Sequence, residues 1–267
     1  MQSFKRILFI LFTLFVGVYL LIVSILYFQQ ESLIFPARKL SLHHEFTYTD
    51  SFEELNISVD DEISINGLLF KAESTKGLVF YLHGNGGNLE TWGSIASTYT
   101  NLGYDIFIPD YRGYGKSNGS INSEDQFFND MRKVYSKLIE RYNKNTVVII
   151  GYSIGTGTAA MLASENNPKT LVLKAPYYSL TEVVDGRMPF MPDFLLKYNF
   201  ETYKYLKEVS SPIYIFHGTA DNIIPYSNSL KLKEEFNEKV QLITLNNEGH
   251  QLGYNEVYLN NLSEILE

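Results

Sequence analysis

The chain has 267 residues, of which 45% are hydrophobic and 15% aromatic, and it contains no cysteine. The lack of cysteine excludes disulfide bonds, thiolate metal sites and lipid attachment to cysteine. A formal net charge of −8 disfavours nucleic acids and anionic membrane surfaces as electrostatic partners. After the N-terminal region, about 225 residues remain, which is a usual size for a single domain.

The first predicted element is an apolar helix. No charged residue interrupts the chain from Ile7 to Phe28, and as a helix this run is about 33 Å long, enough to cross a hydrocarbon core of about 30 Å. The run ends in bulky and polar residues, Tyr27 to Glu31, which is not typical of a signal-peptide cleavage site. We therefore expect a retained signal anchor over residues 1–30 and a juxtamembrane connector over residues 31–45.

The charges beside this run predict its orientation. Lys5 and Arg6 precede it, and the positive-inside rule then keeps the N-terminus in the cytoplasm and places the rest of the chain on the non-cytoplasmic side. Arg38 and Lys39 follow at a distance and weaken this prediction. The segment Ser32 to Pro36 is apolar enough to lie at the membrane interface or to pack on the domain, and both interpretations stay open.

The remaining chain, residues 46–267, predicts one α/β domain. Two strands near 54–59 and 63–72, with a turn between them, are of antiparallel type. Strands then alternate with helices, which is typical of a mostly parallel sheet covered on both faces. The predicted strands are 77–82, 104–108, 146–150, 170–175, 212–217 and 240–245, and the predicted helices are about 89–101, 123–142, 156–163 and the final residues.

The sequence Gly151-Tyr152-Ser153-Ile154-Gly155 lies between the strand at 146–150 and the Ala-rich helix at 156–163. A Gly-x-Ser-x-Gly sequence in a strand–turn–helix context predicts a nucleophile elbow, with an exposed serine at a helix N-terminus. The flanking glycines suit a strained turn in which side chains would clash with neighbouring elements. Ser153 is therefore the candidate nucleophile.

A serine hydroxyl needs a histidine base and a carboxylate that orients the base, in the chain order Ser, Asp or Glu, His. Of the five histidines, His250 is the candidate base, because it follows both Ser153 and the strand at 240–245. Asp221 follows the strand at 212–217 and is the candidate carboxylate, since parallel strands bring their carboxyl ends to one edge. Asp185 competes with it, but no strand precedes Asp185.

His43 and His44 lie before the core, and His83 and His217 each end a strand-like run and precede a glycine, so none of these four is the candidate base.

The loop His83-Gly84-Asn85-Gly86-Gly87-Asn88 follows another strand. The backbone N–H groups of Asn85 and Ile154 are the candidate donors of an oxyanion hole. A phosphate-binding loop is disfavoured, because neither Gly-Lys-Ser/Thr nor Gly-x-Gly-x-x-Gly occurs there. A second glycine-containing loop, Asp110 to Ser117, is interpreted as a braced turn near the rim of the site.

With these motifs the chain resembles the α/β-hydrolase superfamily from about Phe46 to the C-terminus. The motifs His83 to Asn88, Asp110 to Ser117, Gly151 to Gly155 and His217 to Pro225 are similar to those of membrane-anchored serine hydrolases that include the depalmitoylating α/β-hydrolase-domain proteins. The resemblance implies Ser153 as nucleophile, His250 as base, Asp221 as its orienter and the N–H groups of Asn85 and Ile154 as oxyanion hole.

The superfamily also inserts a cap after its sixth core strand, where this chain carries the apolar insertion of about residues 181–209. Such a cap would favour an acyl chain; the alternative is a short helix pair that packs on the sheet. Nothing in the sequence indicates a metal or an organic cofactor.

We expect a membrane-anchored serine hydrolase that cleaves an acyl ester or thioester of a small-molecule or lipid-like substrate through an acyl-enzyme. The alternatives are a serine peptidase or amidase of the same fold and a catalytically silent binding protein with this fold. The sequence predicts no particular acyl or leaving group and no oligomeric state.

Overall fold

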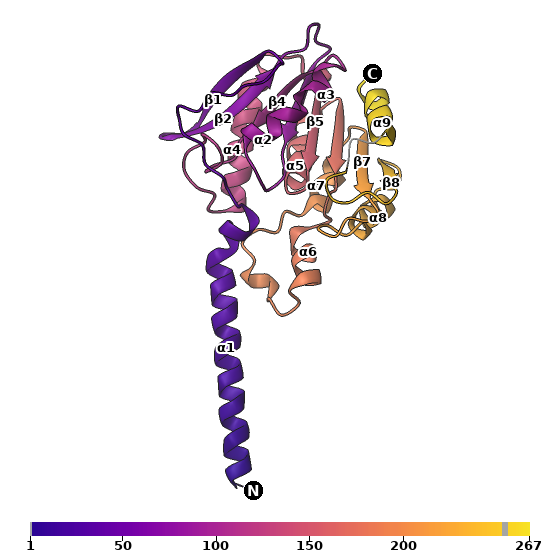
Figure 1. Cartoon of the computed structure of the whole chain (residues 1–267). Coiled ribbons are helices and arrows are strands. Elements are labelled where there is room, and N and C mark those ends of the chain that lie inside the picture. The colour runs from indigo at the N-terminus through magenta and orange to yellow at the C-terminus, as the bar shows by residue number, and fades with distance from the viewer. Residues whose placement is uncertain (1, 253–255) are drawn as a thin grey trace.

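The computed structural model describes residues 2–252 and 256–267; Met1, in the expected anchor, and residues 253–255, in the expected hydrolase domain, lie outside the described residues. The N-terminal helix α1 (Gln2–Ile34) projects away from the rest of the chain (Figure 1). It is long and apolar enough to cross a membrane, and little of its most apolar part is buried.

Within the described residues, eight strands form one sheet in the order β1-β2-β4-β3-β5-β6-β7-β8. β1 pairs with β2, and β2 with β4, in antiparallel fashion, whereas all other neighbours are parallel. The predicted mostly parallel α/β sheet is therefore confirmed. The strands are β1 (Phe52–Asp60), β2 (Ile63–Phe70), β3 (Leu78–Leu82), β4 (Asp105–Pro109), β5 (Val147–Tyr152), β6 (Thr170–Lys174), β7 (Ile213–Gly218) and β8 (Val240–Leu245).

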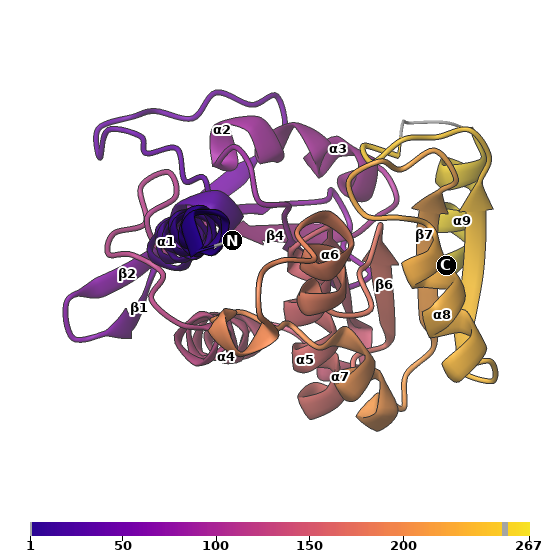
Figure 2. The same cartoon turned by 90° about the horizontal axis from the view of Figure 1, so that it is seen from below.

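Helices cover both faces of the sheet (Figure 2). One face carries α4 (Glu124–Ile139), α5 (Gly155–Asn166), α7 (Thr202–Glu208) and α8 (Ser227–Glu235), and the other carries α2 (Leu89–Trp92), α3 (Ala96–Thr100) and α9 (Glu256–Leu266). Each face has its own apolar core. The central strands are apolar on both sides, as is typical of parallel strands that are buried between helices.

Two predicted helices differ from the structure. The helix expected at about 89–101 is interrupted by a 3-10 turn at Gly93–Ile95, where Gly93 packs so closely on Tyr48 that a Cβ would lie 2.4 Å from a carbon of the tyrosine ring. The helix expected at 123–142 ends at Ile139. The chain then turns so that the hydroxyl of Tyr142 donates a hydrogen bond of 2.7 Å to Asp105.

The insertion after β6 divides into two parts. The first part contains α6 (Leu180–Arg187) and a 3-10 turn at Asp193–Leu195, and it lies beside the upper part of α1, below the carboxyl edge of the sheet (Figure 1). We call residues 180–199 the cap. The second part, α7, packs against α5 on the face of the sheet. The sequence left two alternatives for this insertion, a cap and a short helix pair that packs on the sheet. The first part lies at the position of a cap, and the second part packs on the sheet.

The segment after α1 packs on the domain. The side chain of Phe35 is only 5% exposed, and its ring contacts the rings of Phe127, Tyr198 and Phe200. This contact joins the end of α1 to both α4 and the cap. Phe35 of the segment Ser32 to Pro36 thus packs on the domain, whereas Ser32, Leu33 and Pro36 are exposed, and for these three residues both interpretations stay open.

Candidate active site

Ser153 occupies a strained turn between β5 and α5. Its φ is +53°, a left-handed conformation that costs a residue other than glycine about 1–3 kcal/mol. The turn needs glycine on either side, since a Cβ at Gly151 would lie 2.7 Å from the carbonyl oxygen of Gly155, and one at Gly155 would lie 2.3 Å from that of Leu82. The sequence therefore fixes a tight elbow that presents the serine at the start of a helix.

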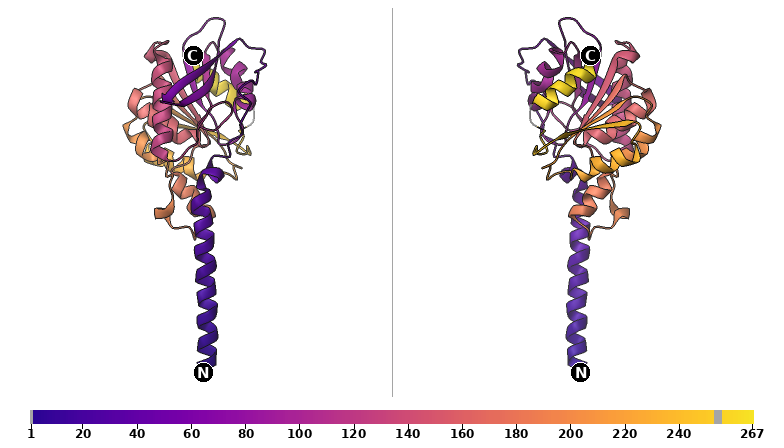
Figure 3. Two further views of the ribbon diagram at one scale, coloured as in Figure 1. Left: turned by 90° about the vertical axis from the view of Figure 1, so that its left-hand side faces the viewer. Right: turned by 90° about the vertical axis from the view of Figure 1, so that its right-hand side faces the viewer.

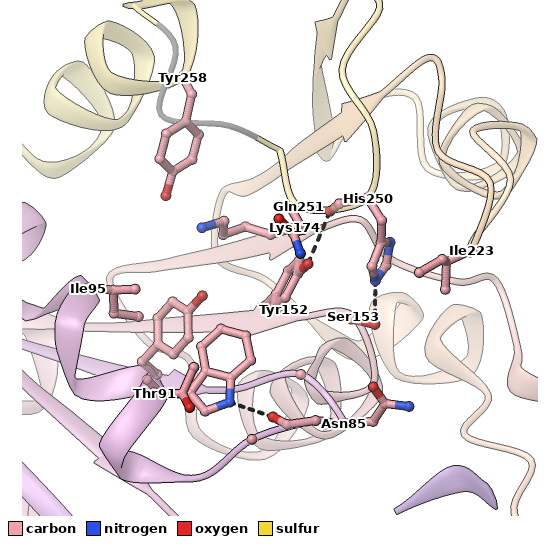
Figure 4. Close-up of a pocket in the computed structure, with 15 residues that line it drawn as sticks. Asn85, Thr91, Ile95, Tyr152, Ser153, Lys174, Ile223, His250, Gln251 and Tyr258 are labelled. Atoms are coloured by element: carbon pink, nitrogen blue, oxygen red, sulfur yellow. Dashed lines mark hydrogen bonds between the residues drawn. The ribbon is translucent and has the colours of Figure 1, made fainter. Parts of the chain in front are cut away.

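The structure brings together the three side chains that the sequence singled out, and Figure 4 shows two of them, Ser153 and His250. Oγ of Ser153 lies 2.9 Å from Nε2 of His250, and Nδ1 of His250 lies 2.7 Å from Oδ2 of Asp221. Because Asp221 accepts from Nδ1, the neutral ring has Nε2 free to accept the serine proton. This geometry places a histidine at the hydroxyl and a carboxylate behind the histidine.

The carboxylate of Asp221 accepts hydrogen bonds at both oxygens. Oδ1 accepts from the backbone N–H groups of Ile223, at 2.8 Å, and Ile224, at 2.9 Å. Burial alone would raise the pKa of Asp221, but hydrogen bonds from His217, His250 and the backbone of Ile224 outweigh it and hold the pKa well below the ordinary 3.8. Asp221 is therefore an anion that is fixed in place before any substrate binds.

His217, which the sequence analysis set aside, lies directly behind Asp221. Its Nε2 faces two acceptors, Oδ2 of Asp221 at 3.1 Å and the carbonyl of Ile224 at 2.9 Å, so Nε2 carries the proton. Nδ1 lies 2.6 Å from the hydroxyl of Ser229. The signal that could have identified His217 is its place four residues before Asp221, at the end of β7.

Asp185, the competing carboxylate, is not brought into the site. It is exposed on α6, and its carboxyl group lies beside that of Asp193. Among the residues that the structure describes, no group of three His, Cys, Asp or Glu side chains could hold a metal ion.

Hydrogen bonds fix the two peptide groups that carry the candidate oxyanion donors. The N–H of Asn85 and the carbonyl of Gly84 form one peptide group, and this carbonyl accepts a hydrogen bond from Nδ1 of His83 at 2.7 Å. The N–H of Ile154 and the carbonyl of Ser153 likewise form one peptide group, and this carbonyl accepts a hydrogen bond from the hydroxyl of Thr156 at 2.7 Å. Neither peptide is free to rotate, so both N–H dipoles are oriented in advance.

The loop from Asp110 to Ser117 braces the loop from His83 to Asn88. The hydroxyl of Tyr111 donates to the carbonyl of His83, and that of Tyr114 donates to the carbonyl of Asn85, each at 2.7 Å. Asp110 is fully buried and lies 3.3 Å from Nε2 of His83. Burial raises the pKa of Asp110, although the neighbouring His83 opposes this effect. His83, like His217, thus has a structural place at the site that the sequence analysis did not find.

Two cavities meet at Ser153. The first has a volume of about 400 Å³ and also reaches His250, and Lys174 and Gln251 contribute polar groups to it (Figure 4). The second, of about 200 Å³, lies under the cap and does not reach His250. Its wall is mostly apolar and includes Leu33, Ile34, Val183, Val184, Met188 and Ile224. A substrate whose reacting carbonyl lies at Ser153 could therefore extend in two directions.

Comparison with known proteins agrees with this architecture. A family model described as serine aminopeptidase, S33, matches residues 73–199. Alpha/beta hydrolase domain-containing protein 17B of Xenopus laevis is 32% identical over 186 residues, which cover 66% of this chain and 61% of that protein. The match thus spans about three fifths of that relative's length.

Solved structures show the same fold. The esterase Pf2001 of Pyrococcus furiosus is 18% identical and superposes with a TM-score of 0.70, covering 86% of this chain and 95% of that chain. Est1E of Butyrivibrio proteoclasticus, solved with ferulic acid bound, is 17% identical with a TM-score of 0.64, over 79% of this chain and 96% of that chain. The elbow, the strand order and these matches together show that the chain has the α/β-hydrolase fold and is similar to hydrolases of that superfamily.

Proposed function

We propose that this protein is a membrane-anchored serine hydrolase that cleaves an acyl ester or thioester through an acyl-enzyme. The observation that carries the proposal is the hydrogen-bonded series from Ser153 through His250 to Asp221, which begins at a strained elbow. In this role Ser153 is the nucleophile, His250 is the base and Asp221 orients the base. The N–H groups of Asn85 and Ile154 form the oxyanion hole.

The reaction follows from these positions. As Oγ of Ser153 attacks the carbonyl carbon, its proton moves to Nε2 of His250, and the carbonyl oxygen becomes an oxyanion that accepts from the two N–H groups. When the intermediate collapses, His250 returns the proton to the leaving oxygen or sulfur. A water molecule then attacks the acyl-enzyme, His250 accepts the proton of that water, and a carboxylic acid is released as the serine regains its proton.

The two cavities suggest where the parts of the substrate lie. The leaving group must receive its proton from His250, so it occupies the cavity that reaches His250. The acyl group then occupies the apolar cavity under the cap. Burial of each acyl methylene group in that cavity would contribute about 0.8 kcal/mol, which favours acyl groups longer than acetyl.

An aminopeptidase, as named in the matching family model, is the second candidate. Such an enzyme binds the positive N-terminal amine of a peptide, which requires an acidic partner. Among the described residues that line the two cavities there is no aspartate or glutamate, whereas Lys174 and Arg187 are present. This charge distribution favours an acyl substrate over a free peptide N-terminus.

The anchor is part of the proposal. Among the described residues, α1 is the helix that could cross a membrane, and the basic residues Lys5 and Arg6 at its start favour an N-terminus in the cytoplasm. The catalytic domain would then lie on the non-cytoplasmic side, with the cap facing the membrane surface.

A substrate panel tests the proposed activity. The purified full-length protein in detergent is assayed with acyl esters, acyl thioesters and aminoacyl amides, beside Ser153→Ala and a control variant, Ser94→Ala. Ser94 is exposed and bonds only locally, to the carbonyl of Thr91. We expect esters or thioesters to be cleaved by the wild type and by Ser94→Ala, and not by Ser153→Ala. Cleavage of aminoacyl amides alone would favour the peptidase.

A further inference from the structure

One face of α1 is covered by the cap. Most side chains of this helix are exposed, but a stripe that recurs every three or four residues is buried or half-buried. This spacing places its members on one face of a helix. The stripe consists of Val16, Tyr19, Val23, Leu26 and Gln30, and Val23 is only 6% exposed. The views in Figure 1 and Figure 3 agree that the cap lies beside the part of α1 nearest the domain.

Hydrogen bonds fix the cap against α1 at two levels. At the upper level, the side-chain amide of Gln30 donates to the carbonyl of Leu195 at 2.8 Å and accepts from the N–H of Lys197 at 2.9 Å. At the lower level, the hydroxyl of Tyr19 donates to the carbonyl of Phe190 at 3.0 Å. The cap therefore extends along α1 toward its N-terminus instead of ending at the domain.

The lower level falls inside the apolar run of α1. Tyr19 lies nine residues before Phe28, which is about 14 Å along the helix axis, and a hydrocarbon core of about 30 Å gives each leaflet about 15 Å. If α1 crosses a bilayer, the backbone at Phe190 lies below the level at which the apolar run ends. The part of the cap nearest Tyr19 must then share the hydrocarbon region with the helix.

The chemistry of this part of the cap suits such a position. We call Met188–Leu196 the cap tip. It is apolar apart from Asp193, which lies beside Asp185 of α6, and Phe190 and Phe194 are 46% and 86% exposed. The first charged residue of α1 after its apolar run, Glu31, lies beside the first charged residue of the cap after the cap tip, Lys197. These two residues form an ion pair at 3.0 Å. The exposed aromatic rings would gain burial in lipid, as in interfacial segments.

The contact between α1 and the cap, which we call the seam, is continuous with the cavity that ends at Ser153. A cavity of about 50 Å³ lies between Leu26 and Gln30 of α1 and Met191 and Leu196 of the cap. Four of its lining residues, Leu33, Ile34, Val184 and Met188, also line the cavity under the cap that ends at Ser153. One apolar wall thus runs from the middle of α1 to the catalytic serine.

We propose that the cap tip is a second membrane-embedded element, seated beside α1 in the leaflet nearest the domain. The seam between them then opens the acyl cavity to the bilayer. An acyl chain would reach Ser153 sideways from the lipid, without leaving the hydrocarbon region. This route rests on the proposed hydrolase function, whereas the insertion of the cap tip does not.

Spin labels measure the depth of the cap tip directly, because the natural chain has no cysteine. Phe190→Cys and Phe194→Cys are prepared in the full-length protein, labelled and placed in phosphatidylcholine vesicles, and collisions with oxygen and with a water-soluble nickel chelate are compared. Phe15→Cys, in the apolar run, gives the lipid reference, and Lys144→Cys, on the exposed loop before β5, gives the aqueous reference. We expect both cap labels to resemble Phe15→Cys. Labels that resemble Lys144→Cys would overturn the insertion.

A kinetic comparison tests the route. Phe190→Asp introduces a charge at the cap tip, and we expect the hydrolysis of a long-chain ester in vesicles to fall about tenfold, which corresponds to about 1.4 kcal/mol. Hydrolysis of a soluble acetate ester should be unchanged. Equal losses on both esters, or no loss on either, would overturn the route. If the wild type cleaves neither ester, the proposed function fails, and the spin labels still decide the insertion.

Discussion

Nε2 of His217 lies 3.1 Å from Oδ2 of Asp221, the same oxygen that accepts the hydrogen bond from Nδ1 of His250. Asp221 is thus held from behind by one histidine while it orients the other. His217 is a positioning residue in this arrangement, because it touches neither Ser153 nor the cavities that reach it.

His217→Phe should therefore impair turnover rather than substrate binding. A hydrogen bond to a charged group contributes about 1.5–3 kcal/mol, so we expect kcat to fall about tenfold or more with KM little changed. His217→Gln offers an N–H donor and should recover part of the loss. Steady-state kinetics of both variants decide this. A change confined to KM, or equal losses in the two variants, would mean that His217 serves packing alone.

The ionisation of Asp221 should make the folded protein less stable as the pH falls. Because its pKa in the folded protein lies below the ordinary 3.8, the ionised carboxylate stabilises the fold. This contribution is fully present above the unfolded-state pKa and is lost as the pH falls through the folded-state pKa.

We expect the melting temperature of the wild type to fall more steeply than that of Asp221→Asn as the pH decreases below about 4. Thermal unfolding of both full-length proteins in detergent, followed by circular dichroism, gives the comparison. Parallel curves for the two proteins would show that Asp221 does not have the depressed pKa.

Tyr114→Phe should weaken the oxyanion hole from a distance. The variant removes the hydroxyl that donates to the carbonyl of Asn85, so the loop that carries the Asn85 N–H loses one of its braces. We expect kcat to fall several-fold, less than the factor of about 10²–10³ reported for loss of an oxyanion donor itself.

Tyr142→Phe is the matched control for this prediction, since Tyr142 lies before β5 and its hydroxyl donates to Asp105 at the start of β4. It should lower the melting temperature without changing kcat. If both variants have wild-type kcat, the brace has no role in catalysis.

Leu33→Trp should change the preference for acyl-chain length. Leu33 lines the apolar cavity at the end of α1, and a larger side chain would fill part of its roughly 200 Å³. We expect the ratio of long-chain to acetate ester hydrolysis to fall about tenfold, equivalent to the loss of about two buried methylene groups. Leu42→Trp, at an exposed position outside the cavity, should leave the ratio unchanged. An unchanged ratio in Leu33→Trp would place the acyl group elsewhere.

The sequence was informative where a residue's role depends on its own strand or turn. Ser153, Asp221 and His250 each follow a strand, and parallel strands bring their carboxyl ends to one edge, so their proximity could be predicted. The sheet and its helices were predictable for the same reason. Residue patterns of this kind report local geometry directly.

Of the partners of His83 and His217, only Asp221, four residues after His217, has a signal in the sequence, and the others depend on contacts that only the folded chain places. The stripe on α1 was hidden for another reason: a helix that is apolar all round shows no amphipathic pattern. The interruption at Gly93 depends on close packing with Tyr48, a residue far away in the sequence.

Covalent labelling shows whether Ser153 is an activated nucleophile. The detergent-extracted full-length protein is treated with a fluorophosphonate, and the modified residue is identified by mass spectrometry, with Ser153→Ala, His250→Ala and Ser94→Ala beside it. We expect modification at Ser153 in the wild type and in Ser94→Ala, and none in the other two variants. Folded wild-type protein that stays unmodified, or that is modified equally in His250→Ala, would contradict this expectation.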